Sequence, residues 1–201
     1  MMTRERTRDP LRPKQCGPKG GMDMENRKIL SRLKHLVSRH GTHDPYELAA
    51  AMGIQVRLIH MQELRGFCVQ VMKQYFIFIR DDMSEQMQRM CCAHELAHVV
   101  LHKEYLAKEP GRLNMALYDG NSRAEYEANL FSAFLLIDGG ELTDCLRQGM
   151  DLASVASTLD VNVNLVALRL SAPQTAGRAV DLPFTPDRRF LGRIADRSDS
   201  V

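Results

Sequence analysis

Long apolar runs and paired cysteines are both missing from this sequence. No stretch approaches the roughly 20 apolar residues that a transmembrane helix needs, and the basic N-terminus lacks the apolar segment of a secretory signal. The five cysteines are odd in number and show no Cys-x-x-Cys spacing, so a disulfide framework is not expected. These absences predict a cytoplasmic protein with reduced cysteines and no membrane segment.

A large excess of one charge is also missing. The formal net charge is +2, and the 44% hydrophobic and 26% charged residues are ordinary for one globular domain of 201 residues. Residues 1–20 carry six basic and two acidic side chains, so the rest of the chain is slightly acidic. Direct DNA binding is therefore not expected of the folded part, although a basic arm that touches nucleic acid is the alternative for the N-terminus.

The sequence does contain the motif His94-Glu95-Leu96-Ala97-His98. Two residues four apart lie on one face of an α-helix, about 6 Å apart along its axis. Two imidazoles at that spacing can bind one tetrahedral Zn²⁺ ion at about 2.0–2.1 Å. Glu95 is rotated about 100° from His94, beside the metal rather than toward it. The motif predicts a zinc site with His94 and His98 as ligands and Glu95 as the catalytic base.

The residues around this motif favour a helix. Asp82 and Glu85 have the spacing of a capping box that would start it. Apolar residues and both histidines then recur at steps of three or four and form one stripe, which contains Met83, Met87, Met90, Cys91, His94, Ala97, His98 and Leu101. The alternative is a buried helix with two hydrogen-bonded core histidines, but a buried ionisable cluster without a metal is costly.

A third metal ligand has to come from outside this helix. His102 lies eight residues after His94, about 12 Å along the helix axis, so their two rings cannot bind one ion. Residues 122–137 predict a second long helix that is rich in apolar side chains. The third ligand is therefore sought among the carboxylates of that helix.

Two glutamates of the second helix compete for this role. Glu127 lies on the apolar stripe, where a carboxylate needs a partner, and it is the predicted third ligand. Glu125 is the alternative, because the register of a helix is easily misjudged from sequence. Asn129 is expected to hydrogen-bond a ligating histidine, and His102 is a further candidate for such a supporting contact.

The rest of the chain predicts an α+β protein. Residues 1–24 are expected to form a disordered basic arm, and residues 173–201 an extended or disordered tail with Phe184, Phe190 and Leu191 as docking points. Residues 25–172 are expected to form one mainly helical domain with a small antiparallel sheet. Within it the pattern predicts helices at 25–39 and 45–52, strands at 54–60, 66–72 and 75–80, and an irregular connection at 103–121.

Residues 149–172 have helix-turn-helix proportions, with a turn at 160–162. The only charged residues in this segment are Asp151, Asp160 and Arg169. Helix pairs that read DNA need Lys and Arg for phosphate contacts, so we expect these helices to pack on the domain instead.

These features together resemble the ImmA/IrrE family of bacterial metallopeptidases. The resemblance spans about residues 44–171 and rests mainly on two segments, 93–102 and 125–136. One departure follows the second segment, where the Leu-Leu-Met-Pro of the family is replaced by Leu-Leu-Ile-Asp at 135–138.

The resemblance implies a zincin-like fold with a gluzincin-like site. A glutamate of the downstream helix would be the third ligand, and the Glu-Ala-Asn element of the family places it at 127. The implied function is Zn²⁺-dependent endopeptidase activity on a protein substrate, such as a helix-turn-helix repressor of a mobile element or stress regulon. The alternative is a zinc-stabilised anti-repressor that binds without proteolysis. Arg123, Tyr118 and His102 are candidates for stabilising the oxyanion, and no other cofactor is expected.

Overall fold

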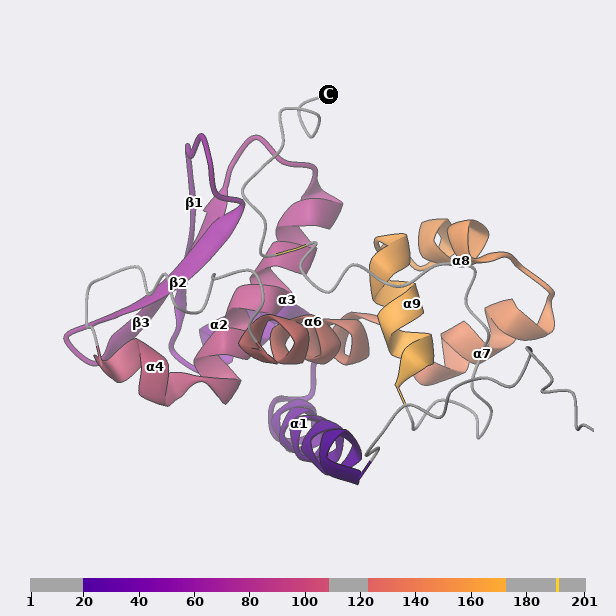
Figure 1. Ribbon diagram of the computed structural model, residues 1–201. Helices are drawn as coiled ribbons and strands as arrows, with labels where there is room; N and C mark the ends of the chain where they lie inside the picture. The colour runs from indigo at the N-terminus through magenta and orange to yellow at the C-terminus, as the bar shows by residue number, and fades with distance from the viewer. Residues whose placement is uncertain (1–19, 109–122, 173–190, 192–201) are drawn as a thin grey trace, which may run out of the picture.

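The computed structural model describes residues 20–108, 123–172 and 191. Its strands are β1 (Gln55–Ile59), β2 (Gly66–Val71) and β3 (Gln74–Arg80). Its helices are α1 (Gly20–His40), α2 (Pro45–Ala51), α3 (Glu85–Leu101), α4 (Lys103–Lys108), α6 (Arg123–Leu136), α7 (Gly139–Arg147), α8 (Leu152–Thr158) and α9 (Val163–Ser171). The expected α+β class, mainly helical with one small sheet, is confirmed (Figure 1).

The sheet is mixed rather than wholly antiparallel, in the strand order β1-β3-β2. β2 and β3 form the predicted antiparallel hairpin, but β1 pairs in parallel with β3. The hairpin turn consists of Met72 and Lys73, which have φ angles of 48° and 67°. Positive φ at both central residues gives the twist that two-residue hairpins favour. Because this turn places β2 on one side of β3, the other side of β3 is left for β1.

Helix capping fixes where the second and third helices begin. Asp44 caps α2 as expected, accepting hydrogen bonds from the amides of Tyr46 and Glu47 at 2.8 and 2.9 Å. The predicted capping box at the start of α3 is wrong. Ser84 is the N-cap instead, and its side chain accepts a hydrogen bond from the Met87 amide at 3.3 Å. Asp82 lies before the helix and pairs with Arg80 at 2.6 Å.

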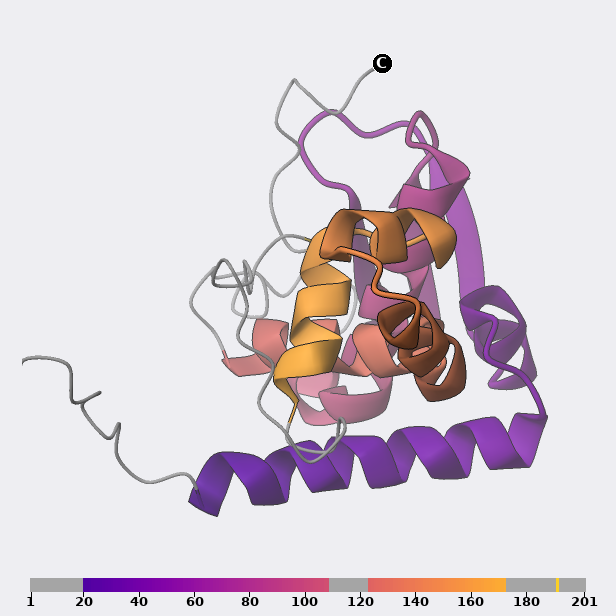
Figure 2. The ribbon, with the colours of Figure 1, turned by 90° about the vertical axis from the view of Figure 1, so that its right-hand side faces the viewer.

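α6 lies at the centre of the helices, packed against α3, α9 and α1 (Figure 1). The long helix α1 runs beneath this group along one side of the molecule (Figure 2). Since several elements pack around α6, most of its residues are buried, including the fully buried Phe131 and Leu130. This position brings α6 side by side with the helix that carries the histidine motif.

Two expected segment boundaries differ from the structure, and one described residue bears on the C-terminal tail. α1 begins at Gly20, within the segment expected to be a disordered arm, and the rest of that arm lies outside the described residues. α4 occupies part of the connection expected to be irregular. Of the C-terminal tail only Leu191 is described, and it is buried in the hydrophobic core.

The two helices with helix-turn-helix proportions are α8 and α9, and α9 packs against α6. The guanidinium of Arg169 lies 3.9 Å from the ring centroid of Phe134, so it contacts the core of the domain. The turn residue Asp160 has a φ of 50° and accepts a hydrogen bond from Gln86 of α3 at 2.8 Å. The helix pair therefore contacts both α3, which carries the histidine motif, and α6.

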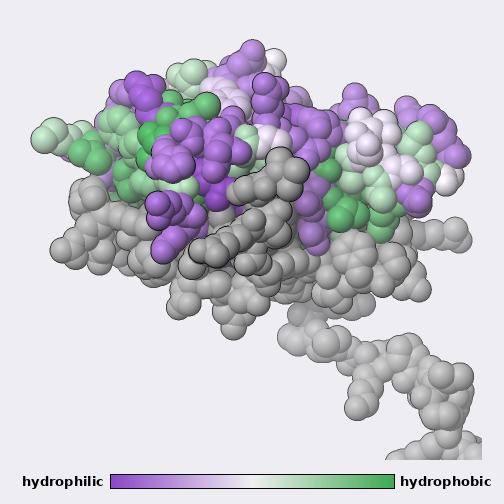
Figure 3. All heavy atoms as spheres, turned by 90° about the horizontal axis from the view of Figure 1, so that it is seen from above, coloured by the Kyte–Doolittle hydropathy of each residue, from purple (hydrophilic) through white to green (hydrophobic). Residues whose placement is uncertain are grey.

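The surface carries both hydrophilic and hydrophobic side chains. On the face seen in Figure 3, hydrophilic residues gather near the middle and hydrophobic residues lie among them. Within the described ranges, no helix has both the length and the apolar character needed to span a membrane.

Candidate metal centre

α3 places His94 and His98 one turn apart on the side of the helix that faces α6. Both imidazoles are fully buried. Their Nε2 atoms lie 3.1 Å apart, and the two rings meet edge to face. Two nitrogen atoms that point at a common centre are the arrangement that the spacing of the motif predicted.

Glu125 of α6 reaches the same point from the opposite helix. Its Oε2 lies 3.4 Å from His94 Nε2, and its Oε1 lies 3.3 Å from His98 Nε2. Four ligands at about 2.0–2.1 Å from a tetrahedral Zn²⁺ ion are separated by about 3.3 Å. The three side chains therefore fit a zinc ion in both donor type and spacing. Among the described residues, they are the only cluster of three or more His, Cys, Asp or Glu side chains that could hold a metal ion.

The structure brings Glu125, and not the expected Glu127, to the two histidines. Glu127 does not face His94 and His98; its carboxylate contacts Arg123 at 2.6 Å and His102 at 3.1 Å. The apolar-stripe argument failed because α6 is buried on more than one side, so an apolar neighbour does not identify the face toward α3. The signal that the sequence did hold is a polar stripe of Glu125, Asn129 and Ser132, spaced four and three residues apart.

A second layer of hydrogen bonds orients both histidines. His94 Nδ1 lies 3.0 Å from Oδ1 of the buried Asn129, as expected for that residue. His98 Nδ1 lies 3.1 Å from His102 Nδ1, and His102 Nε2 lies 3.1 Å from Glu127 Oε2. His102 is therefore a neighbour of His98 and lies outside the three-residue group, as the helix geometry required.

The charges in the cluster set its proton affinities. Burial lowers the pKa of His98 to about 4, against the opposing hydrogen bond to Glu125. Burial acts on His94 in the same direction, but the Glu125 charge and hydrogen bond outweigh it and raise the pKa of His94. For Glu125, the neighbouring histidines overcome the effect of burial and hold its pKa well below the usual range. The carboxylate is thus ionised, as a metal ligand requires.

Glu95 is buried beside this group, with an exposed fraction of 1%. Strand β2 approaches it closely at Gly66. A Cβ atom at Gly66 would lie 2.5 Å from Cys91 Sγ, 3.0 Å from the Phe78 carbonyl oxygen and 3.5 Å from Glu95 Cγ. Only glycine fits at this position without a shift, so the missing side chain of Gly66 lets β2 lie against the side of α3 that carries Cys91 and Glu95.

The structure describes two of the three candidates for oxyanion stabilisation. Tyr118 lies outside the described residues. Arg123 and His102 are both engaged with Glu127, at the outer end of the hydrogen-bond chain from His98. Both side chains therefore belong to the series of contacts that leads from His98 through His102 and Glu127 to Arg123.

Comparison with known proteins agrees with this geometry. The peptidase family described as the IrrE N-terminal-like domain matches residues 49–171, which include all of the histidine motif and α6. The chain is also 30% identical over 144 residues to "Uncharacterized immunity region protein 2" of Bacillus phage phi105, covering 70% of this chain and 88% of the phage protein. The chain belongs to the IrrE N-terminal-like peptidase family.

Proposed function

We propose that this protein is a zinc-dependent endopeptidase. The observation that supports it best is a group of three ligand side chains, His94, His98 and Glu125, with no fourth among the described residues. Structural zinc sites are usually closed by four protein ligands, whereas catalytic sites use three and leave a position for water or substrate. Glu95 next to that group supplies a base, for which a purely structural zinc has no use.

The residues divide the reaction between them. Held by His94, His98 and Glu125, a zinc ion would lower the pKa of water toward about 7 and would polarise the scissile carbonyl. Glu95 accepts the proton of the attacking water and delivers it to the amine that leaves. Asn129 and His102 keep the ligand rings in place through the Nδ1 atoms of His94 and His98. Burial of all these groups excludes competing water and strengthens their electrostatic interactions.

Strand β2 offers a place for the substrate backbone. It is an edge strand, paired with β3 on one side only among the described strands. It also packs against α3, next to Glu95. An extended peptide that adds to this edge would gain main-chain hydrogen bonds and pass close to the metal ligands.

The proposed substrate is a helix-turn-helix repressor encoded on a mobile element or in a stress regulon. The relative from phage phi105 is named as an immunity region protein, and this context supports a partner that controls phage genes. The alternative function is a zinc-stabilised anti-repressor that acts by contact alone. Three ligands with an adjacent base favour the enzyme over this alternative.

The substitution Glu95→Gln tests the proposal. The purified protein, loaded with zinc, is incubated with the repressor encoded nearest to its gene, and new peptide termini are measured by mass spectrometry. We expect Glu95→Gln to keep its zinc and to cleave about 10²- to 10⁴-fold more slowly. The matched control is Glu85→Gln, which changes an exposed glutamate in the first turn of the same helix.

Two outcomes would count against the enzyme. Cleavage at the wild-type rate by zinc-loaded Glu95→Gln would remove Glu95 from the mechanism. Release of an intact repressor from its operator, by wild type and Glu95→Gln alike, would favour the anti-repressor.

A further inference from the structure

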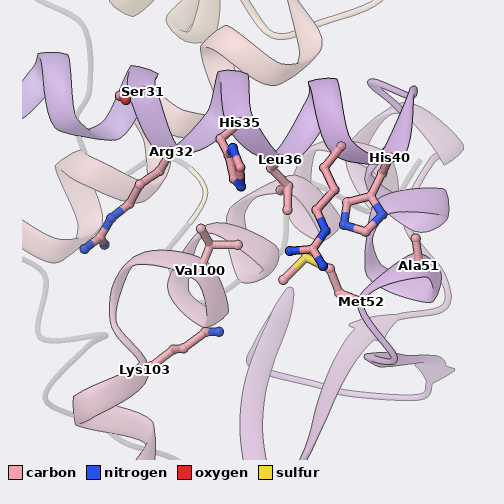
Figure 4. A pocket seen from close by; sticks show the side chains of 10 residues that line it. Ser31, Arg32, His35, Leu36, His40, Ala51, Met52, Val100 and Lys103 are labelled. Carbon is pink, nitrogen blue, oxygen red and sulfur yellow. The ribbon is translucent and has the colours of Figure 1, made fainter.

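A pocket lies between α1, the end of α2 and the last turn of α3, away from the three-residue metal group. It has a volume of about 650 Å³, within the range of roughly 300–1,000 Å³ that small-molecule sites occupy. In Figure 4, His35 and Leu36 point from α1 toward Val100 of α3, while Met52 and Lys103 close other sides. Nothing in the proposed peptidase mechanism uses this pocket.

The charged side chains that line the pocket are all basic. Arg32, Arg39 and Lys103 line it together with two histidines, and no lining residue carries a carboxylate. None of these three cations takes part in the ion pairs found among the described residues. From 26 to 40 the sequence has five Lys or Arg and no Asp or Glu. The pocket therefore lacks internal neutralisation and favours an anionic occupant.

The cations are arranged along one face of α1. One side of the helix carries Arg32, then the pair His35 and Leu36, then the pair Arg39 and His40, because the steps from 32 to 35 or 36 and from 36 to 39 or 40 are three or four residues. Arg32 and Arg39 are separated by about 10 Å along the axis. A ligand with several phosphate groups can contact both side chains at once while they stay extended along the helix.

The apolar part of the lining narrows the ligand class further. Leu36, Met52 and Val100 are partly buried and line the pocket beside the cations. A purely ionic ligand would gain nothing from this surface, but a planar base would bury apolar area on it. The geometry points to a site for a phosphorylated nucleotide, with the phosphates at Arg32, Arg39 and Lys103 and the base on Leu36, Met52 and Val100.

The same chemistry occurs in a free nucleotide and in a single-stranded nucleic acid. Both have phosphates and bases, and both would use the same residues. The site borders the C-terminal end of α3 in either case. Its lining residues Val100 and Lys103 lie two residues before and one residue after His102, which contacts His98. An occupant would therefore lie against the last turn of α3, next to His102 and its hydrogen bond with His98.

Binding by the full chain tests the inference directly. Calorimetry at fixed salt would compare ATP, inorganic tripolyphosphate, a short oligothymidine and an acidic peptide of equal charge. We expect ATP or the oligothymidine to bind more tightly than tripolyphosphate and the peptide, because only they carry a base. Tighter binding of ATP identifies the free nucleotide as the ligand, and tighter binding of the oligothymidine identifies the nucleic acid.

The chain offers a matched control for charge. The double variant Arg32→Gln, Arg39→Gln removes two cations from the pocket, and we expect at least about tenfold weaker binding of the preferred ligand. Arg27→Gln, Lys34→Gln removes two exposed cations with the same seven-residue spacing on roughly the opposite face of α1. This control is expected to bind within about twofold of wild type. Thermal unfolding of both variants would establish that each is folded.

Three results would overturn the inference. Equal losses in the two double variants would show non-specific attraction to the basic helix. Binding of tripolyphosphate as tightly as both base-containing ligands would remove the role of the apolar residues. Preference for the acidic peptide would replace the nucleotide by a protein segment.

Discussion

His98 Nδ1 and His102 Nδ1 lie 3.1 Å apart, so one nitrogen must donate a hydrogen bond to the other. A His98 that binds metal through Nε2 keeps its proton on Nδ1 and is the donor. His102 then accepts through Nδ1 and donates through Nε2 to Glu127 Oε2, 3.1 Å away. Arg123 donates to the other oxygen of Glu127 at 2.6 Å. With zinc on His98, the hydrogen bonds would run in one direction from this buried histidine to Glu127, which also accepts from the exposed Arg123.

The first prediction concerns His102. His102→Ala removes the acceptor that fixes the ring and tautomer of His98, so zinc affinity should fall about 10- to 100-fold. The measurement is competition for zinc with a chelator of known affinity, which does not depend on substrate. His102→Gln, which can still accept and donate, should recover part of the loss. His60→Ala is the control, because His60 is 74% exposed. Unchanged zinc affinity in His102→Ala would show that this hydrogen bond does not orient the ligand.

The second prediction separates the two glutamates of α6. Glu125→Gln should lose most of the bound zinc, because the substitution removes the charged ligand oxygen next to both histidines. Glu127→Gln should retain about one zinc per chain with weaker affinity, because it alters the contacts with His102 and Arg123 and leaves the three-residue group unchanged. Metal content after dialysis distinguishes the two variants. Loss of zinc in Glu127→Gln with retention in Glu125→Gln would restore the assignment made from the apolar stripe.

The third prediction concerns the close approach of β2 to α3. Gly66→Ala places a methyl group 2.5 Å from Cys91 Sγ and should destabilise the fold by about 1–3 kcal/mol in denaturant unfolding. Combining it with Cys91→Ala removes the sulfur and should relieve part of the strain. The contact with the Phe78 carbonyl oxygen, at 3.0 Å, would remain. Strict additivity of the two substitutions would mean that the chain avoids this contact by a backbone shift.

The fourth prediction concerns pH. Glu125 raises the pKa of His94 above its ordinary value despite burial, while burial lowers the pKa of His98 to about 4. Between these two pKa values, the metal-free site holds one proton, on His94, and zinc must displace it. Zinc affinity should therefore rise with pH, about tenfold per unit over this range. Below pH 4 the dependence should steepen because His98 also takes up a proton.

Zinc titrations in a non-coordinating buffer at several pH values measure this slope. Thermal unfolding at each pH would confirm that the metal-free protein is folded. A slope corresponding to two protons between pH 5 and 6 would mean that both histidines are protonated together. That result would place the pKa of His98 above this range and would contradict the lowering of its pKa by burial.

Local patterns in the sequence determined the parts of this protein that depend on helix and turn geometry. The positions of His94, Glu95 and His98 follow from the helical repeat alone, and the cap at Asp44 follows from the proline after it. The β2–β3 hairpin was also predictable, because strand alternation and a short connection restrict the pairing. The family resemblance rests on the same local segments.

Tertiary packing decided which glutamate faces the histidines and how β1 joins the sheet. Glu125 and Glu127 are only two residues apart, and a helix buried on several sides gives no single apolar face to choose between them. The parallel pairing of β1 and the contact between His102 and Glu127 join residues that are distant in sequence. Periodicity shows which residues share a face, but the neighbour of each face is set only when the elements pack together.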